Sequence, residues 1–195
     1  QAASPRSPQV GSGKSSLLQA LLGELKLLRG SAPHVPGRIA YCSQVPWVMA
    51  DTVEGNVLFG RDMDRGFYEA VVSACALTGD IDQLPEGDQT EIGERGVNLS
   101  GGQKARLSLA RAAYSRPDVA LLDDPLSAVD SKVGRHIFQR CISSDGLMAG
   151  AARLLVTHQK QFLPLCNRVV VLRGGAIAAS GSWEELSGAG LPELQ

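Results

Sequence analysis

The segment SPQVGSGKSS, residues 7–16, has the residue types that could bind a phosphate group. Glycines let the backbone curve closely around an anion, and the start of a helix offers unpaired N–H groups and a partial positive charge. Lys14 would contact the β- and γ-phosphate oxygens, and the Ser15 hydroxyl would ligate Mg²⁺. The motif is incomplete, because Pro8 occupies the position of its first glycine. A glycine turn before an ordinary helix is therefore an alternative for this segment taken alone.

A second group of polar residues follows a short hydrophobic run in VALLDDP, residues 119–125. The run predicts a buried strand that ends at Asp123. Asp123 would hold Mg²⁺ directly or through water, and Asp124 would lie beside the terminal phosphate, where a base orients the attacking water. A strand that ends in an aspartate turn is common by itself. In a chain that also contains GSGKSS, this purely structural explanation is much weaker.

The segment LSGGQKARLSLARA, residues 99–112, places two adjacent glycines before an amphipathic helix. It is a second potential anion site, since it again joins a polar loop to a helix N-terminus. Here the chain resembles the ATP-binding-cassette (ABC) family, whose signature motif is LSGGQ. In that family the motif closes over the γ-phosphate of ATP held by a second domain. The resemblance therefore implies a head-to-tail dimer with ATP between the two domains.

Other motifs follow in the order that is typical of this family. Gln44 in YCSQVPW matches the Q-loop, which contacts Mg²⁺ and water, and His158 in VTH matches the switch histidine, which hydrogen-bonds the γ-phosphate. Ser127 and Asp130 in SAVD match the D-loop, which crosses the dimer interface. The site residues that the resemblance implies are Asp124, His158 and Gln44 for catalysis; Gly11, Ser12, Gly13, Lys14, Ser15, Ser16, Ser100, Gly101, Gly102 and Gln103 for ATP binding; and Ser15, Gln44 and Asp123 for Mg²⁺.

Further segments narrow the resemblance to the first nucleotide-binding domain of the multidrug-resistance-associated (C) subfamily. They are Trp47 after the Q-loop, NVLFG, LLDDPLSAVD, and TEIGERG at residues 90–96, which looks like a loop that touches helices of the membrane domains in exporters. The resemblance runs from about Val10 to Leu186. It implies export of amphipathic anions across a membrane, with this domain at the cytoplasmic face and with transmembrane domains and a second nucleotide-binding domain as partners.

Hydrophobic runs that alternate with helical patterns predict an α/β domain with a mainly parallel sheet. With the motifs, this indicates the P-loop NTPase fold of ABC ATPases. We divide the chain into an irregular N-terminal segment (1–9), a nucleotide-binding domain (10–190) with an inserted, mainly helical subdomain at about 50–115, and a tail (191–195). The segment RVVVLRGGAIAASGS predicts two strands around a Gly-Gly turn.

Three departures from the family pattern qualify this interpretation. Asp124 replaces the glutamate of most active ABC sites, which implies slow hydrolysis at this domain's own site and an active site on the second domain. Pro8 is expected to weaken ATP binding without abolishing it. The strands that normally precede the P-loop, with the aromatic residue that stacks on adenine, are missing, since the first aromatic residue is Tyr41. We therefore expect the N-terminal β-subdomain to be largely absent, as in a fragment, a truncated isoform or a misjoined gene model.

Composition bears on the alternatives. The 195 residues carry a net charge of −1, which weakens any proposal of a nucleic-acid partner. No apolar run is long enough to span a bilayer. The four cysteines are widely spaced, which favours free thiols over a metal site. Three other functions stay open: a regulatory module that holds ATP with little hydrolysis, a soluble ABC ATPase of DNA repair or translation, and an inert product of a decayed gene.

Overall fold

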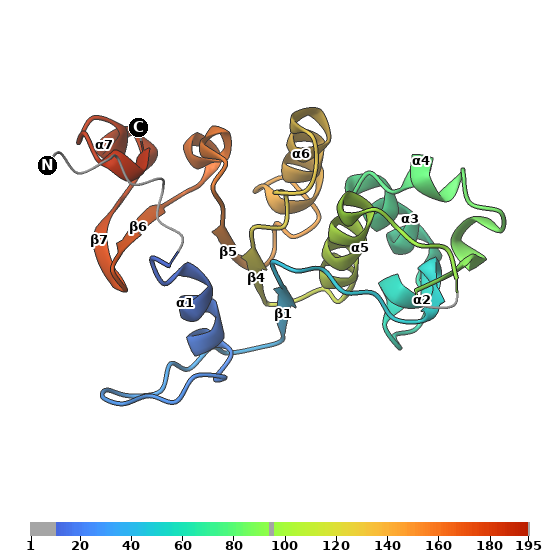
Figure 1. Ribbon diagram of the computed structural model, residues 1–195, viewed down its shortest axis with the longest axis horizontal. Coiled ribbons are helices and arrows are strands. Elements are labelled where there is room, and N and C mark those ends of the chain that lie inside the picture. Colours follow the sequence, from blue (N-terminus) through green and yellow to red (C-terminus); the bar gives the residue numbers. More distant parts are fainter. Residues whose placement is uncertain (1–10, 94–95, 195) are drawn as a thin grey trace, which may run out of the picture. The chain divides into compact units, whose positions relative to one another are not determined.

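The computed structural model describes residues 11–93 and 96–194, which belong to two compact units. The first unit combines the described residues up to His34 with those from Gln159 onward, and the second unit is Val35–His158 (Figure 1). The predicted irregular segment 1–9, with Pro8, lies outside the described residues. So do residues 94 and 95 of TEIGERG and the last residue of the predicted tail.

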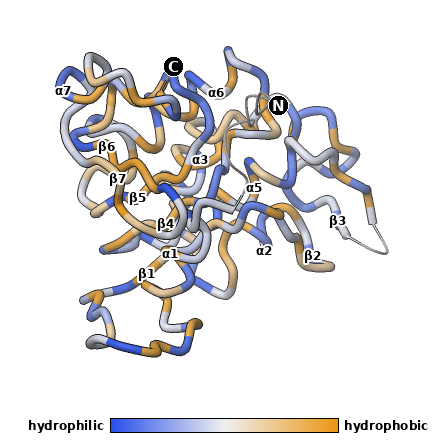
Figure 2. The backbone as a smooth tube through the Cα atoms, turned by 60° about the vertical axis from the view of Figure 1, so that its left-hand side comes forward, coloured by the Kyte–Doolittle hydropathy of each residue, from blue (hydrophilic) through white to orange (hydrophobic). Residues whose placement is uncertain are grey.

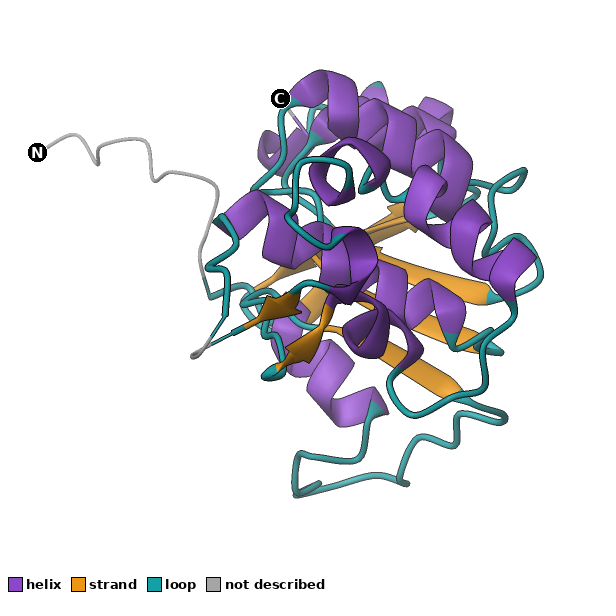
Figure 3. Ribbon diagram, turned by 90° about the vertical axis from the view of Figure 1, so that its right-hand side faces the viewer, coloured by secondary structure: helices purple, strands orange, loops and turns teal. Residues whose placement is uncertain are grey.

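The second unit is built on a three-stranded parallel sheet in the order β1–β4–β5 (Figure 3). The strands are β1 (Ile39–Cys42), β4 (Val119–Asp123) and β5 (Ala152–Val156). Residues 120–123 of the central strand β4 are all buried, as expected for a strand of a parallel sheet that is covered on both faces. The predicted α/β fold with a parallel sheet core is confirmed.

Helices make up most of the rest of the second unit. They are α2 (Val53–Leu58), α3 (Arg65–Ala74), α4 (Thr78–Ile81), η1 (Gly87–Gln89), α5 (Gly101–Tyr114), α6 (Ser131–Ile137) and η2 (Phe138–Ile142). The two-residue strands β2 (Asp51–Thr52) and β3 (Glu91–Ile92) pair antiparallel. Helix α2 lies within the segment predicted as a mainly helical subdomain. It begins there because the Thr52 hydroxyl caps it by accepting a hydrogen bond from Gly55 N at 2.9 Å.

Arg111 of α5 holds the segment that follows the predicted Q-loop. Its guanidinium donates to both the carbonyl and the side-chain oxygen of Asn56 at 2.8 Å, and it lies over the Trp47 ring at 4.0 Å from the ring centroid. Asn56 is fully buried and also accepts a hydrogen bond from Met49 N at 2.8 Å. Burial lowers the pKa of Arg111, yet all these contacts favour a cation over a neutral side chain.

The first unit contains α1 (Lys14–Leu21), η3 (Lys160–Leu165), β6 (Val169–Arg173), β7 (Ala176–Gly181), α7 (Trp183–Ser187) and η4 (Pro192–Leu194). Strands β6 and β7 form an antiparallel hairpin, and Gly174 and Gly175 between them have φ 57° and 81°. Such positive values suit a tight hairpin turn, so the predicted two strands around a Gly-Gly turn are confirmed. A small hydrophobic core of Val169, Val171 and Leu186 joins the hairpin to α7.

Hydropathy along the chain follows these elements. In Figure 2 the central strand β4 is predominantly hydrophobic, as expected for a strand whose residues 120–123 are buried. Among the described residues, none of the helices has the length and hydrophobicity that a membrane span requires.

The Arg111 contacts predict a large cost of removing this side chain. Arg111→Ala should lower the free energy of unfolding by about 3 kcal/mol, because it removes two charge-assisted hydrogen bonds to the buried Asn56 and the packing of the guanidinium on Trp47. Urea unfolding followed by circular dichroism measures this change. Arg135→Ala, at an exposed position of α6, is the matched control and should stay within about 0.5 kcal/mol of the wild type. Equal losses in the two variants would contradict the assignment.

Candidate nucleotide-binding site

The glycine loop leads into helix α1 in the first unit. Gly11 and Gly13 have φ 100° and 97°, in the left-handed region that favours glycine. The Ser12 carbonyl accepts a hydrogen bond from Gly175 N at 3.1 Å, and a Cβ on Gly13 would lie 3.3 Å from Gly175 Cα. The β6–β7 turn thus approaches the loop closely. Both this approach and the positive φ favour glycine at position 13.

Lys14 is the first residue of α1, and Ser15 and Ser16 follow it in the first turn. Lys14 Nζ donates to Ser12 Oγ at 3.0 Å, so the ammonium group is turned back toward the loop. The N-cap Gly13 offers no side-chain hydrogen bond to the N–H groups of this turn. By backbone conformation, helix position and charge, the loop fits a phosphate group.

Two buried aspartates follow one another at the end of β4. Asp123 and Asp124 are only 3% and 5% exposed. Asp124 has φ 51°, which is uncommon for a residue other than glycine. Its N–H donates to Val156 O at 2.9 Å, and its carbonyl accepts from Ser127 Oγ at 2.9 Å. Buried carboxylates are stable beside donors or a cation, so this pair fits a Mg²⁺ site by its chemistry.

The parallel sheet brings three of the predicted residues to one edge of the second unit. Gln44 follows β1 by two residues, Asp123 ends β4, and His158 follows β5 by two residues. The register pairs Asp123 with Val156 and residue 42 with residue 122. Because the carboxyl ends of parallel strands meet at the same edge of a sheet, all three residues lie there. Gln44 and His158 are exposed, whereas Asp123 is buried.

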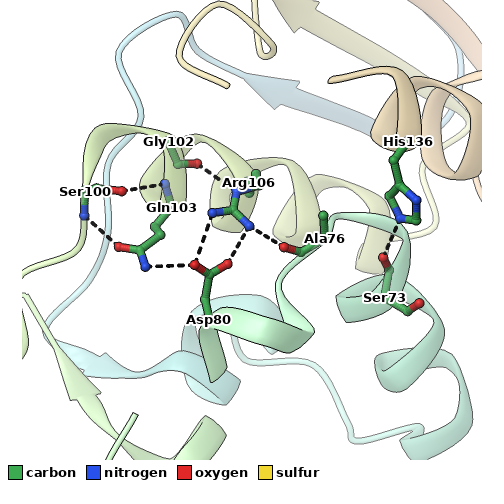
Figure 4. A network of polar contacts seen from close by, with 8 residues as sticks. All are labelled: Ser73, Ala76, Asp80, Ser100, Gly102, Gln103, Arg106 and His136. Atoms are coloured by element: carbon green, nitrogen blue, oxygen red, sulfur yellow. Dashed lines mark hydrogen bonds and ion pairs between the residues drawn. The ribbon is translucent and has the colours of Figure 1, made fainter. Parts of the chain in front are cut away.

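The signature residues form the start of helix α5 (Figure 4). Ser100 is the N-cap, and its hydroxyl accepts from Gln103 N at 3.2 Å while Gln103 Oε1 accepts from Ser100 N at 2.8 Å. This reciprocal pair is a capping box, and it fixes the direction in which α5 begins. Ser100 and Gly101 are exposed at this N-terminus, so an approaching anion would meet them.

The second signature glycine lies against the predicted D-loop. A Cβ added to Gly102 would lie 2.8 Å from the Ala128 carbonyl oxygen, whereas a Cβ on Gly101 would meet nothing within 4 Å. Asp130, at the end of the same loop, caps α6 by accepting hydrogen bonds from Lys132 N and Val133 N, both at 3.0 Å. These hydrogen bonds lower the pKa of Asp130. The D-loop is therefore held at the signature on one side and at α6 on the other.

Two charged residues beside the signature were not singled out from the sequence. Asp80 of α4 and Arg106 of α5 form an ion pair, and Asp80 also accepts a hydrogen bond from Gln103 Nε2 at 2.9 Å (Figure 4). Arg106 lies three residues after Gln103, on the same helix face, and that spacing could have indicated it. Nothing in the segment LTGDIDQL marks Asp80 as the residue that reaches α5.

These features together define a P-loop nucleotide-binding domain of the ABC type. The model of the family described as "ABC transporter" matches residues 9–127, which is more than half of the chain. The chain belongs to the ABC transporter family. Domains of this ATPase family bind ATP, and Mg²⁺ is the usual partner ion.

The curated relatives are named either as a multidrug resistance protein or as members of ATP-binding cassette sub-family C. The chain is 56% identical over 178 residues to "Multidrug resistance protein mrp-7" of Caenorhabditis elegans. The matched region is 91% of this chain and 12% of that protein. It is 50% identical over 177 residues to "ATP-binding cassette sub-family C member 2" of Mus musculus (91% of this chain, 11% of that protein). It is 51% identical over 177 residues to "ATP-binding cassette sub-family C member 3" of Homo sapiens, covering 91% and 12%. The chain thus spans about an eighth or less of these proteins' length.

The different surroundings of the two signature glycines predict different effects of adding one methyl group. Gly102→Ala should lower the free energy of unfolding by about 1–3 kcal/mol, because the new Cβ overlaps the Ala128 carbonyl. Gly101→Ala should stay within about 0.5 kcal/mol of the wild type, since its Cβ has open space. Parallel urea titrations of both variants provide the comparison. A Gly101→Ala chain that loses as much stability as Gly102→Ala would contradict the packing described.

Proposed function

We propose that this chain is one nucleotide-binding domain of an ABC-type exporter, similar to the first such domain of the C subfamily, and that it acts at the cytoplasmic face of a membrane. The observation that carries the proposal is the presence in one chain of two helix N-termini suited to phosphate, at α1 and at α5. A single bound nucleotide needs only one of them. The second is explained if the signature serves ATP held by another domain in a head-to-tail dimer.

At the domain's own site the P-loop residues bind the nucleotide phosphates. The N–H groups after Gly11 donate to phosphate oxygens, and Lys14 balances their negative charge. Ser15, Gln44 and Asp123 are the residues that would hold Mg²⁺, which supplies neutralisation of the charge on the phosphates when it is bound. Carboxylate, amide and hydroxyl oxygens are the ligand types that Mg²⁺ prefers, which supports this assignment.

Asp124 and His158 are the proposed catalytic residues, with Gln44 orienting water. Asp124 accepts the proton of the attacking water, and His158 donates a hydrogen bond to the terminal phosphate. Hydrogen bonds to Val156 and Ser127 hold the backbone of Asp124, so a main-chain shift cannot bring its shorter side chain closer to the attacking water. A base must come within hydrogen-bond reach of its proton. Own-site hydrolysis is therefore slow, and most turnover takes place on the second domain, where this chain supplies the signature.

The proposed partners are transmembrane domains and the second nucleotide-binding domain. An apolar surface after the Q-loop supports contact with membrane-domain helices, because Val45, Trp47 and Phe59 are 79%, 48% and 42% exposed. The Trp47 and Phe59 rings pack edge to face, 5.7 Å apart. ATP binding would close the two domains and hydrolysis would reopen them, which transmits the cycle to the transported amphipathic anions.

A regulatory module that holds ATP with little hydrolysis is a second candidate. The observation in its favour is again the short side chain of Asp124 on a backbone that Val156 and Ser127 hold in place. It shares ATP binding with the main proposal and differs in turnover. Lys14→Ala tests ATP binding and Asp124→Glu tests turnover, so the two steps are separable.

ATP binding is tested by Lys14→Ala. Loss of the ammonium group should weaken binding of a fluorescent ATP analogue by about tenfold or more, because a charge-assisted contact to phosphate contributes about 1.5–3 kcal/mol. Lys160→Ala, an exposed lysine of the same unit, is the control and should bind like the wild type. If Lys14→Ala and the wild type bind with equal affinity, the P-loop assignment is wrong.

The catalytic base is tested by Asp124→Glu. The longer side chain should raise single-turnover hydrolysis of bound ATP by about tenfold or more, since a well-placed base contributes about 10²–10⁴ in rate. Asp124→Asn is the inactive control, and ATP affinity should match across the three chains. Brisk hydrolysis by the wild type, at the rate of Asp124→Glu, would rule out a slow own site.

A further inference from the structure

The first turn of the signature helix is held by an ion pair that lies outside the signature. Asp80 comes from α4, and Arg106 comes from the second turn of α5 (Figure 4). Their side chains are only 23% and 14% exposed, so solvent screens the pair less than it would an exposed one. The two groups are thus suited to fix the relative position of α4 and the start of α5.

Each member of the pair also holds part of the signature itself. Asp80 Oδ1 accepts from Gln103 Nε2 at 2.9 Å and from Arg106 Nη2 at 3.2 Å. Arg106 Nε donates to Gly102 O at 3.3 Å, and Arg106 Nη1 donates to Ala76 O and to the other Asp80 oxygen. The planar guanidinium therefore binds one backbone carbonyl of the signature and one of the turn before α4 at the same time.

Gln103 links Ser100 to Asp80 by hydrogen bonds. Its Oε1 accepts from Ser100 N and its Nε2 donates to Asp80, so both ends of the carboxamide are occupied. Oxygen and nitrogen of this group cannot be exchanged without breaking both bonds. Orientation of the Ser100 backbone therefore depends on Asp80, although the two residues lie in different elements.

We propose that Asp80 and Arg106 are positioning residues for the signature: through Gln103 and Gly102 they aim the Ser100 hydroxyl and the first N–H groups of α5 at the γ-phosphate of ATP on the second domain. The proposal rests on the proposed function. Neither side chain needs to touch the nucleotide. Because the pair is neutral overall, its role lies in geometry rather than in adding positive charge to the site.

The test compares Asp80→Asn, Asp80→Glu and the matched control Asp82→Asn, which removes the same charge at an exposed position two residues later. In the 195-residue chain, hydrogen exchange of residues 100–104 should be about tenfold faster or more in Asp80→Asn, while residues 119–123 of β4 stay at the wild-type rate. Asp80→Glu, which keeps the carboxylate, should be close to the wild type. Unchanged exchange at residues 100–104 in Asp80→Asn would overturn the proposal.

Turnover separates positioning from a purely structural contact. In the complete transporter that contains this domain, Asp80→Asn should lower kcat for ATP hydrolysis by about tenfold or more and leave KM within about threefold, because the signature acts mainly in the closed, reacting state. Asp80→Glu should restore most of kcat. A kcat within about twofold of the wild type in Asp80→Asn would overturn the proposal.

Two further measurements keep the outcome clear. If residues 119–123 also exchange faster in Asp80→Asn, the variant has lost its fold, and Arg106→Lys replaces it with the same expected results, since lysine keeps the charge but not the two-sided fork. Failure of the proposed function would be recognised by a different result, because the Lys14→Ala chain would then bind ATP like the wild type. Faster exchange at residues 100–104 in Asp80→Asn, together with weaker ATP binding by Lys14→Ala, supports both the positioning role and the proposed function.

Discussion

Parallel pairing of β4 with strands on both sides is the constraint on which the second unit depends. Residues 120–123 of the strand are buried, and its sequence is accordingly hydrophobic up to Asp123 at the carboxyl end. The register then places Val156 beside Asp123 and allows the Asp124 N–H to bond to the Val156 carbonyl. One set of backbone hydrogen bonds therefore sets the positions of the strand ends and, with them, of Gln44 and His158.

A different kind of constraint holds the signature. Helix α5 begins at Ser100 through its capping box, and the Ala128 carbonyl leaves no room for a side chain at position 102. Farther along, Arg111 of the same helix is hydrogen-bonded to Asn56 and packs on Trp47. One helix thus connects an N-terminus suited to an anion with the apolar surface that follows the predicted Q-loop. In the proposed function these are the contacts to ATP and to the membrane domains.

Much of the fold could be predicted because the residues concerned signal their structure locally. VALLDDP has the length and composition of a buried strand, and the glycines of RVVVLRGGAIAASGS mark a turn that the structure forms with positive φ at both positions. The start of α2 at Thr52 was obscured by neighbouring turn residues, because a single N-cap is a weak signal. The role of Asp80 depends on how α4 packs against α5, and no local pattern encodes that tertiary contact.

The central claim is that the P-loop and the signature of this chain serve two different ATP molecules. An ATP analogue with a photoreactive group on its γ-phosphate tests this directly, by mass spectrometric mapping of the labelled peptides. In the isolated chain, residues 11–16 should be labelled and residues 99–104 should not. Residues 99–104 should be labelled only when the second nucleotide-binding domain is present and has bound the analogue. Equal labelling of residues 99–104 in the isolated chain would show that the P-loop and the signature contact the same ATP molecule.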